Sequence, residues 1–312
     1  MNMEAQMGTS NDRVASDLTM RIQLGDVCCS LSILDEEVFH TWRGLYENFL
    51  TDVPADVSIE INCVDQLSET EVETAISRTT MVREGTCFRA TGLALEVEYD
   101  CTRRTLGVTA ERSLLSTSLE FNLMNRLLTS AYYTACQVKH GGNPPAMLVH
   151  SCAIMRRERV LLFSGPCEVG KTTIARLCGD EYGRVLNDEM VLVSRSHRDG
   201  TKLKVQEFPT IGGTSQRLNE TAPLNCVLML KQSRRTAARR LGGMDAYLRF
   251  MPQVIMPQQL EASEPQTMLS LIAEFANEVT SATPFFELEF ALDRERLWEA
   301  VGQLERLLDE ED

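Results

Sequence analysis

Residues 165–172, Gly-Pro-Cys-Glu-Val-Gly-Lys-Thr, match the pattern GxxxxGK[ST], and this segment limits the fold more than any other part of the chain. The pattern works only when a strand precedes the glycine-rich loop and a helix follows it. Residues 160–163 form an apolar run before the loop, and residues 173–177 continue in a helical pattern after it. The sequence therefore predicts the strand–loop–helix unit of an α/β nucleotide-binding domain.

The chemistry of this phosphate loop follows from its residue types. Gly165 and Gly170 permit backbone angles that let successive N–H groups converge on phosphate oxygens at the start of a helix. Lys171 can reach the β- and γ-phosphates, and the Thr172 hydroxyl can coordinate Mg²⁺. We therefore expect the chain to bind ATP or another nucleoside triphosphate with Mg²⁺. The predicted nucleotide-binding residues are Gly165, Pro166, Cys167, Glu168, Val169, Gly170, Lys171, Thr172 and Thr173.

A second polar site is expected at Asp188 and Glu189, which follow a short apolar strand at 184–186. Phosphoryl transfer needs acidic groups for the metal ion and often a base for the attacking hydroxyl. A conventional Walker B acid is not found after the apolar run at 225–230, because that run ends in Lys231 instead of an acid. Signatures of ABC-type ATPases and base-recognition motifs of GTPases are not visible in the sequence. We therefore expect Thr172, Asp188 and Glu189 to serve the metal.

His150 lies on an expected strand, 15 residues before Gly165. A single histidine on an apolar strand is usually a core residue whose ring is satisfied by hydrogen bonds. Its position just before the phosphate loop makes it a candidate for the site as well. The residues alone leave both interpretations open.

The organisation expected from the sequence has four parts. Residues 1–17 are polar and form a loose tail, residues 18–112 form an N-terminal α+β domain, residues 113–308 form the phosphate-loop domain, and residues 309–312 form an acidic tail. The helix before the Asn143-Pro144-Pro145 break could belong to either domain.

Hydrophobic periodicity predicts the elements within these domains. In the first domain we expect a helix capped by Asp35, a strand at 57–61 and a hairpin made of 93–99 and 106–108. In the second we expect strands at 146–155, 159–163, 184–186, 191–193, 203–205, 227–230 and 286–290, helical segments across 236–280, and a closing helix capped by Asp293.

Charge and composition narrow the classes of partner. The formal net charge is -14, so neither nucleic acid nor an anionic membrane is an expected partner. No apolar run approaches the roughly 20 residues needed to span a bilayer. The N-terminus lacks a secretory core and the ten cysteines are scattered, so we predict a cytoplasmic protein with reduced thiols. Association of copies into a homo-oligomer stays open.

One basic cluster contrasts with the acidic composition. It has two interpretations, a solvated helix face or a patch that faces phosphate or substrate. Its members are Lys231, Arg234, Arg235, Arg239 and Arg240.

Residues 115–308 together resemble the HPr kinase/phosphorylase group and its phosphoenolpyruvate-carboxykinase-like relatives. The resemblance is carried by Val149-His150 before a strand pair, by the phosphate loop, and by Asn187-Asp188-Glu189 after the next strand. It implies a phosphate-loop domain with a mixed sheet. It also implies that Lys171 polarises the transferred phosphoryl group and that His150 stands near the γ-phosphate. Asp188 or Glu189 would act as base, and the other would assist the metal.

Two positions depart from that family's pattern. HPr kinases resemble one another in having a pair of Asp residues, and in this chain the second position is Glu189. The residue after the loop Ser/Thr is usually Glu in these kinases, and here it is Thr173. No counterpart of their protein-recognition segment is found, so HPr is not the expected acceptor. The leading hypothesis is a kinase that transfers the γ-phosphoryl group to a small-molecule or peptide hydroxyl, with Asp188, Lys171 and His150 as catalytic residues. The alternatives are a nucleotide-binding regulator or assembly factor with little catalysis, and an ATPase that drives a conformational change.

Overall fold

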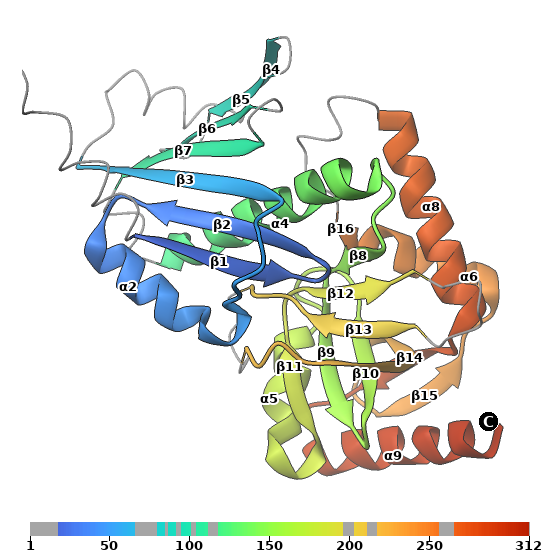
Figure 1. Cartoon of the computed structure of the whole chain (residues 1–312). Helices are drawn as coiled ribbons and strands as arrows, with labels where there is room; N and C mark the ends of the chain where they lie inside the picture. The colour runs from blue at the N-terminus through green and yellow to red at the C-terminus, as the bar shows by residue number, and fades with distance from the viewer. Residues whose placement is uncertain are drawn as a thin grey trace, which may run out of the picture. The chain divides into compact units, whose positions relative to one another are not determined.

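The structure is a computed structural model that describes residues 18–65, 80–84, 87–91, 95–100, 104–111, 118–195, 203–210, 217–255 and 265–311. These residues form a mixed α/β protein whose sheets combine parallel and antiparallel strands (Figure 1). The expected tail at 1–17, residues 93–94 of the expected hairpin and residues 256–264 of the expected helical segments lie outside the described residues. No helix in the described part of the chain is both long enough and apolar enough to cross a bilayer.

The chain divides into two compact units. The first contains residues 1–144 and 257–262, and the second contains residues 145–256 and 263–312. The division therefore falls at residues 144 and 145, whereas the sequence placed it at 112 and 113. The physical reason is helix α4 (Ser118–His140), which packs against strands β2 (Val27–Ile33) and β3 (Val57–Val64) of the first unit.

The first unit is built on a seven-stranded sheet with the order β1-β2-β3-β7-β6-β5-β4. β3 pairs in parallel with β2 and β7, and the other neighbours are antiparallel. Its remaining elements are β1 (Thr19–Leu24), α2 (Glu36–Leu45), the 3₁₀ helix η1 (Glu47–Phe49), β4 (Thr80–Glu84), β5 (Cys87–Thr91), β6 (Leu95–Asp100) and β7 (Thr105–Glu111).

Several local predictions for this unit are confirmed. The Asp35 carboxylate accepts a hydrogen bond from the Val38 N–H at 3.0 Å and so caps α2. The alternating pattern that begins at Val57 forms β3, whose inward residues Val57, Ile59 and Ile61 are buried. The predicted hairpin forms between β6 and β7.

The second unit carries a ten-stranded sheet with the order β11-β9-β10-β14-β13-β12-β8-β16, with β17 beside β14 and β15 beside β17. Its strands are β8 (Ala146–Val149), β9 (Ser151–Arg156), β10 (Arg159–Ser164), β11 (Arg184–Asn187), β12 (Val191–Ser194), β13 (Lys204–Glu207), β14 (Thr221–Gln232), β15 (Ala237–Arg240), β16 (Val254–Ile255) and β17 (Phe285–Phe290). Its helices are α5 (Lys171–Tyr182), α6 (Gly243–Phe250), the 3₁₀ helix η3 (Met251–Gln253), α8 (Pro265–Ala282) and α9 (Arg294–Glu311).

Strand β14 joins the antiparallel part of this sheet to its parallel part. Its first residues pair with β13 antiparallel, while its later residues pair in parallel with β10 on one side and β17 on the other. The three parallel strands β10, β14 and β17 therefore end at the same edge. The phosphate loop begins directly after β10, so this edge carries the candidate site.

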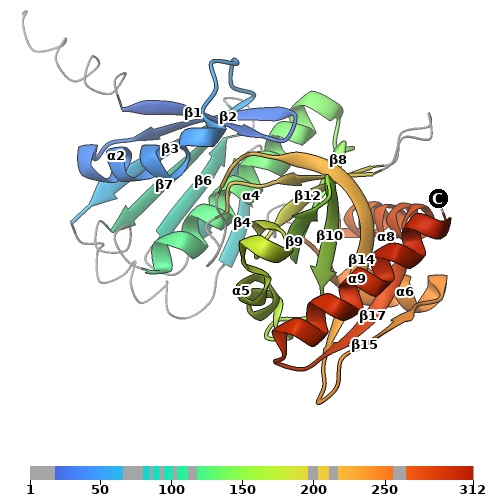
Figure 2. The same cartoon turned by 90° about the horizontal axis from the view of Figure 1, so that it is seen from below.

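Helices cover both faces of this parallel core (Figures 1 and 2). On one face, buried side chains of β9, β10, β14 and β17 pack against α5 and α9 in a single cluster that includes Phe163 and Trp298. On the other face, the ring of Phe285 of β17 packs against that of Phe250 of α6, with 5.4 Å between the ring centroids. The Phe250 ring in turn lies 6.2 Å, centroid to centroid, from the ring of Phe275 of α8. Because neighbouring strand residues point to opposite faces, Phe285 and Phe286 pack on opposite sides of the sheet.

Four predictions for this unit need correction. The expected strand 146–155 is two strands, because the chain leaves β8 at His150 and enters β9. Residues 237–240, expected in a helix, form strand β15 on β17. β14 is much longer than the predicted 227–230. The expected acidic tail continues α9 as far as Glu311, and Asp309 accepts a hydrogen bond from Arg159 at 3.1 Å.

Candidate functional site: a phosphate loop with a histidine and two carboxylates

The phosphate loop connects the end of β10 to the start of α5 through left-handed backbone conformations. Gly165 has φ 150°, Glu168 has φ 63° and Gly170 has φ 114°. A Cβ atom on Gly170 would lie 2.6 Å from the Phe290 ring, so only glycine fits there. Gly165 is buried, whereas Pro166, Cys167 and Glu168 are exposed. The strand–loop–helix unit expected from the sequence is present.

The start of α5 provides donors for an anion. Gly170 is the N-cap residue of α5 and has no side chain that could bind the N–H groups of the first turn. The first intrahelical hydrogen bond runs from the Ile174 N–H to the Gly170 carbonyl at 2.9 Å. The N–H groups of the first turn have no intrahelical partners in any α-helix. Thr172 and Thr173 occupy that first turn and are half-buried. This is the arrangement that binds phosphate at helix N-termini.

Lys171 is buried and folds over its own loop. Its Nζ donates to the Gly165 carbonyl at 2.8 Å and to the Pro166 carbonyl at 3.1 Å. Burial lowers the pKa of Lys171, and the negative forms of Cys167 and Glu189 act in the opposite direction. The ammonium group thus lies at the mouth of the loop with a carboxylate close enough to affect it.

The two carboxylates follow β11 in one turn. Asp188 is buried, while 46% of the Glu189 side chain is exposed. Burial raises the pKa of Glu189, Lys171 lowers it, and Asp188 raises it. Lys171 and Asp188 thus lie close enough to Glu189 to affect the charge of its carboxyl group.

His150 joins the same site from the junction of β8 and β9. Its backbone N–H donates to the Gln253 carbonyl at 2.8 Å, and its ring Nε2 lies 3.8 Å from Oε1 of Glu189. Burial, together with the positive charge of Lys171, lowers the pKa of His150 to about 4. A neutral imidazole can donate or accept a hydrogen bond without adding positive charge beside Lys171.

The donor set fits a hard divalent cation. Thr172 offers a hydroxyl, and Asp188 and Glu189 offer carboxylates; Mg²⁺ prefers such oxygen ligands and keeps several waters and phosphate oxygens. No group of three or more His, Cys, Asp or Glu side chains among the described residues is arranged to hold a metal without other ligands. A cation here would therefore share its coordination with the nucleotide.

The basic cluster lies on strands and a turn instead of a helix face, and three of its five members form ion pairs with glutamates. It spans the end of β14, the following turn and β15, and two glutamates of β17 bind it. Lys231 Nζ lies 2.7 Å from Oε1 of Glu289, and Arg239 Nε lies 2.8 Å from Oε1 of Glu287. The predicted helix fails here because β17 recruits this segment as an edge strand.

Two residues at the site were given no role by the sequence. Gln232, at the end of β14, donates from Nε2 to the loop carbonyl of Glu168 at 3.0 Å. Asn187, the last residue of β11, is fully buried and binds both the acid-bearing turn and the residues after β13. Gln232 had no local signal, but an Asn directly before two carboxylates is typical of a side-chain-stabilised turn.

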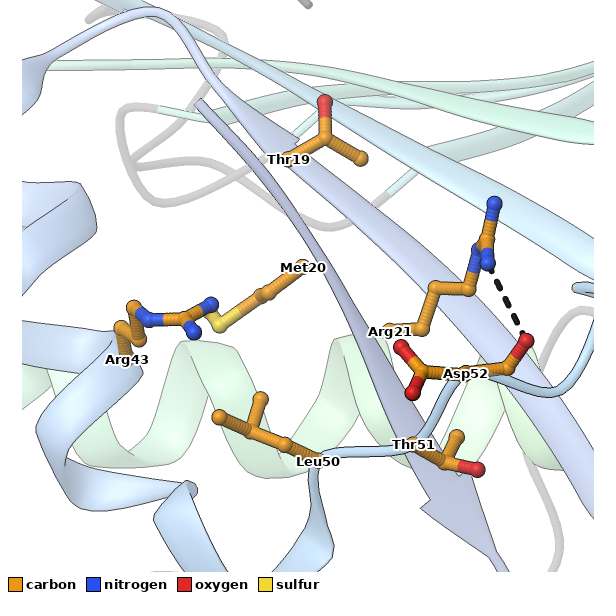
Figure 3. Close-up of a pocket in the computed structure, with 7 residues that line it drawn as sticks. All are labelled: Thr19, Met20, Arg21, Arg43, Leu50, Thr51 and Asp52. Atoms are coloured by element: carbon orange, nitrogen blue, oxygen red, sulfur yellow. Dashed lines mark hydrogen bonds between the residues drawn. The ribbon is translucent and has the colours of Figure 1, made fainter. Parts of the chain in front are cut away.

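A separate hollow of about 380 Å³ lies in the first unit beside β1 (Figure 3). Arg21 closes one side, where its Nη1 donates to the Asp52 carbonyl at 3.2 Å. Figure 3 shows Arg43 reaching toward Met20 on another side. None of the predicted site residues lines this hollow.

In comparisons with known proteins, no family model matches the chain and no curated protein matches it.

Proposed function

We propose that this protein binds a nucleoside triphosphate with Mg²⁺ at the phosphate loop and transfers the γ-phosphoryl group to a hydroxyl. The acceptor is a small molecule or a peptide, and the protein is a divergent relative of the HPr kinases. The observation that carries the proposal is the meeting of Lys171, His150 and the Asp188-Glu189 turn beside a loop with left-handed glycines.

The roles follow from the position and charge of each residue. Loop N–H groups and Lys171 hold the β- and γ-phosphates, and Lys171 compensates the negative charge on the transferred group. Asp188 accepts the proton of the acceptor hydroxyl while the acceptor oxygen bonds to the γ-phosphorus. The bond from that phosphorus to the bridging oxygen breaks, and the nucleoside diphosphate leaves. Mg²⁺, when bound, supplies charge neutralisation of the phosphates and is held by Thr172 and the carboxylates.

Glu189 and His150 act next to this step. Glu189 is the more exposed of the two carboxylates, and burial raises its pKa. Its Oε1 lies 3.8 Å from the Nε2 of His150, so Glu189 is placed to assist the metal ion beside that ring. The neutral imidazole of His150 hydrogen-bonds near the γ-phosphate without competing with Lys171 for it.

The second candidate is a nucleotide-binding regulator with little catalysis. Glu189 in place of a second Asp favours it, because one extra methylene shifts a carboxylate by ~1 Å and such a shift can cost about a hundredfold in rate. The two candidates share nucleotide binding and differ in turnover.

The test is a screen for transfer of labelled γ-phosphate from ATP with Mg²⁺ to a pool of cell metabolites and peptides. Lys171→Ala is the matched control. Label transfer by the wild type and not by the variant supports the kinase. Nucleotide binding with neither transfer nor hydrolysis supports the regulator, and no nucleotide binding at all contradicts both.

A further inference from the structure

Asn187 is a buried polar side chain in contact with two parts of the chain. It is fully buried at the end of β11, directly before the two carboxylates. The side-chain oxygen and nitrogen are both engaged, so the residue is a structural connector and not a solvated turn residue.

The oxygen of this amide shapes the acid-bearing turn. Asn187 Oδ1 accepts hydrogen bonds from the Glu189 N–H at 2.8 Å and from the Met190 N–H at 3.0 Å. Two bonds to one oxygen fix the backbone of the two residues that follow Asp188. The directions of the Asp188 and Glu189 side chains therefore depend on the Asn187 side chain.

The nitrogen of the amide ties that turn to a second segment. Asn187 Nδ2 donates to the Phe208 carbonyl at 3.1 Å and to the Thr210 hydroxyl at 3.0 Å, with the Thr210 carbonyl at 3.3 Å. Thr210 is itself fully buried. This segment leaves β13, which is not a neighbour of β11 in the sheet. No backbone ladder joins the two strands, and the amide makes the connection.

We propose that Asn187 is a positioning residue that holds Asp188 and Glu189 where a nucleotide-bound Mg²⁺ requires them, with Thr210 as its support. The inference rests on the proposed nucleotide and Mg²⁺ site but adds to it a residue that touches neither ligand. Residues that orient metal ligands from behind change metal affinity by about 10- to 100-fold when replaced.

The experiment measures ATP affinity of the full chain with Mg²⁺ and with EDTA, and the rate of phosphate release from ATP. In Asn187→Ala we expect the gain in affinity given by Mg²⁺ to fall about 10-fold or more. Affinity in EDTA should stay within about 3-fold of wild type, because the phosphate loop is unchanged. Where the wild type releases phosphate, kcat should fall by about 100-fold, as expected for a misplaced catalytic group.

Three further variants guard against simple misfolding. Thr210→Val removes the hydroxyl that accepts from Asn187 Nδ2, so the gain in ATP affinity given by Mg²⁺ should fall less than in Asn187→Ala. Thr210→Ser keeps a hydroxyl, so this gain should stay at the wild-type level. Val301→Ala removes core contacts from α9, where Val301 is fully buried in the same unit. It should lower Tm without changing the effect of Mg²⁺.

The outcomes separate this inference from the proposed function. A wild type that binds no ATP contradicts both. A wild type with Mg²⁺-dependent binding and an Asn187→Ala variant with the same Mg²⁺ dependence overturns the role of Asn187 alone. The role is also overturned if Val301→Ala, at an equal drop in Tm, loses as much Mg²⁺ dependence as Asn187→Ala.

Discussion

The ring Nε2 of His150 lies 3.8 Å from Oε1 of Glu189, although 38 residues separate them in the chain. The histidine comes from the exit of β8 and the glutamate from the turn after β11. Lys171 affects the pKa of both groups. This pair shows that the polar residues around the phosphate loop form one electrostatic unit.

The titration of His150 tests this geometry. In EDTA and without nucleotide, the His150 ring should titrate at about 4, well below the ordinary histidine value. Lys171→Ala removes a neighbouring positive charge that disfavours the imidazolium, so the pKa of His150 should rise but stay below its ordinary value, because burial persists. NMR of the ring protons measures both midpoints. A wild-type midpoint near 6.5 would show that the ring is solvated and not part of the site.

The same shift makes a prediction for stability. The folded-state pKa of His150 lies below its unfolded value, so in the window from about 6.5 down to about 4 the unfolded chain binds more protons than the folded one. The folded state therefore keeps its full stability above this window. As pH falls through the window, protonation of His150 in the unfolded chain lowers the free energy of unfolding by at most about 3 kcal/mol. In urea unfolding, His150→Gln should lose less stability than wild type between these limits. His40→Gln, on exposed α2, is the matched control and should behave as wild type.

Asp188 is the residue on which turnover should depend most. Asp188→Asn keeps the shape of the side chain but cannot accept the acceptor's proton, so kcat should fall about 10²- to 10⁴-fold. ATP affinity in EDTA should change little, since the loop and Lys171 are intact. Steady-state kinetics with the acceptor found by the screen, together with direct binding of ATP, measures the two effects. Normal turnover in this variant would exclude Asp188 as the base.

Local sequence patterns predicted the parts of this protein whose structure is decided locally. The phosphate loop, the apolar run of β10 and the closing helix α9 all appear where expected. The helix cap at Asp293 is also confirmed, because its carboxylate accepts from the Arg296 N–H at 3.1 Å. In each case the periodicity or the cap involves residues within a few positions of one another.

Long-range pairing decided what the sequence could not predict. Ala237–Arg240 has good helix formers, yet it pairs antiparallel with β17, and Glu287 there accepts a hydrogen bond from Arg239. The role of Asn187 depends on Phe208 and Thr210, which are brought to it by the sheet and by no local pattern. The unit to which α4 belongs is likewise set by its packing on β2 and β3.

Glu287 of β17 accepts a hydrogen bond from Arg239 of β15 and gives a second pH-dependent prediction. It is buried, and hydrogen bonds from Arg239 and Arg249 lower its pKa. Its folded-state pKa lies below the unfolded value, so its contribution is present above about 4.5 and is lost as pH falls through the folded-state pKa. Glu287→Gln should lower the free energy of unfolding by about 1–3 kcal/mol near neutral pH. Denaturant unfolding should show the difference shrinking in acid; a constant difference would mean that charge is not the cause.

The conformation of Gly170 gives the most direct test of the phosphate loop. Gly170→Ala places a Cβ in a left-handed backbone at φ 114° and 2.6 Å from the Phe290 ring. The strain should cost about 1–3 kcal/mol of folding stability and should weaken ATP binding, because the loop must change shape to relieve it. Gly302→Ala is the matched control on α9, where the nearest atom would be 4.0 Å away. It should stabilise the chain by about 0.5–1 kcal/mol, since alanine is the better helix former. Thermal unfolding and ATP titration of both variants measure the contrast, and equal behaviour of the two would show that the loop does not require this glycine.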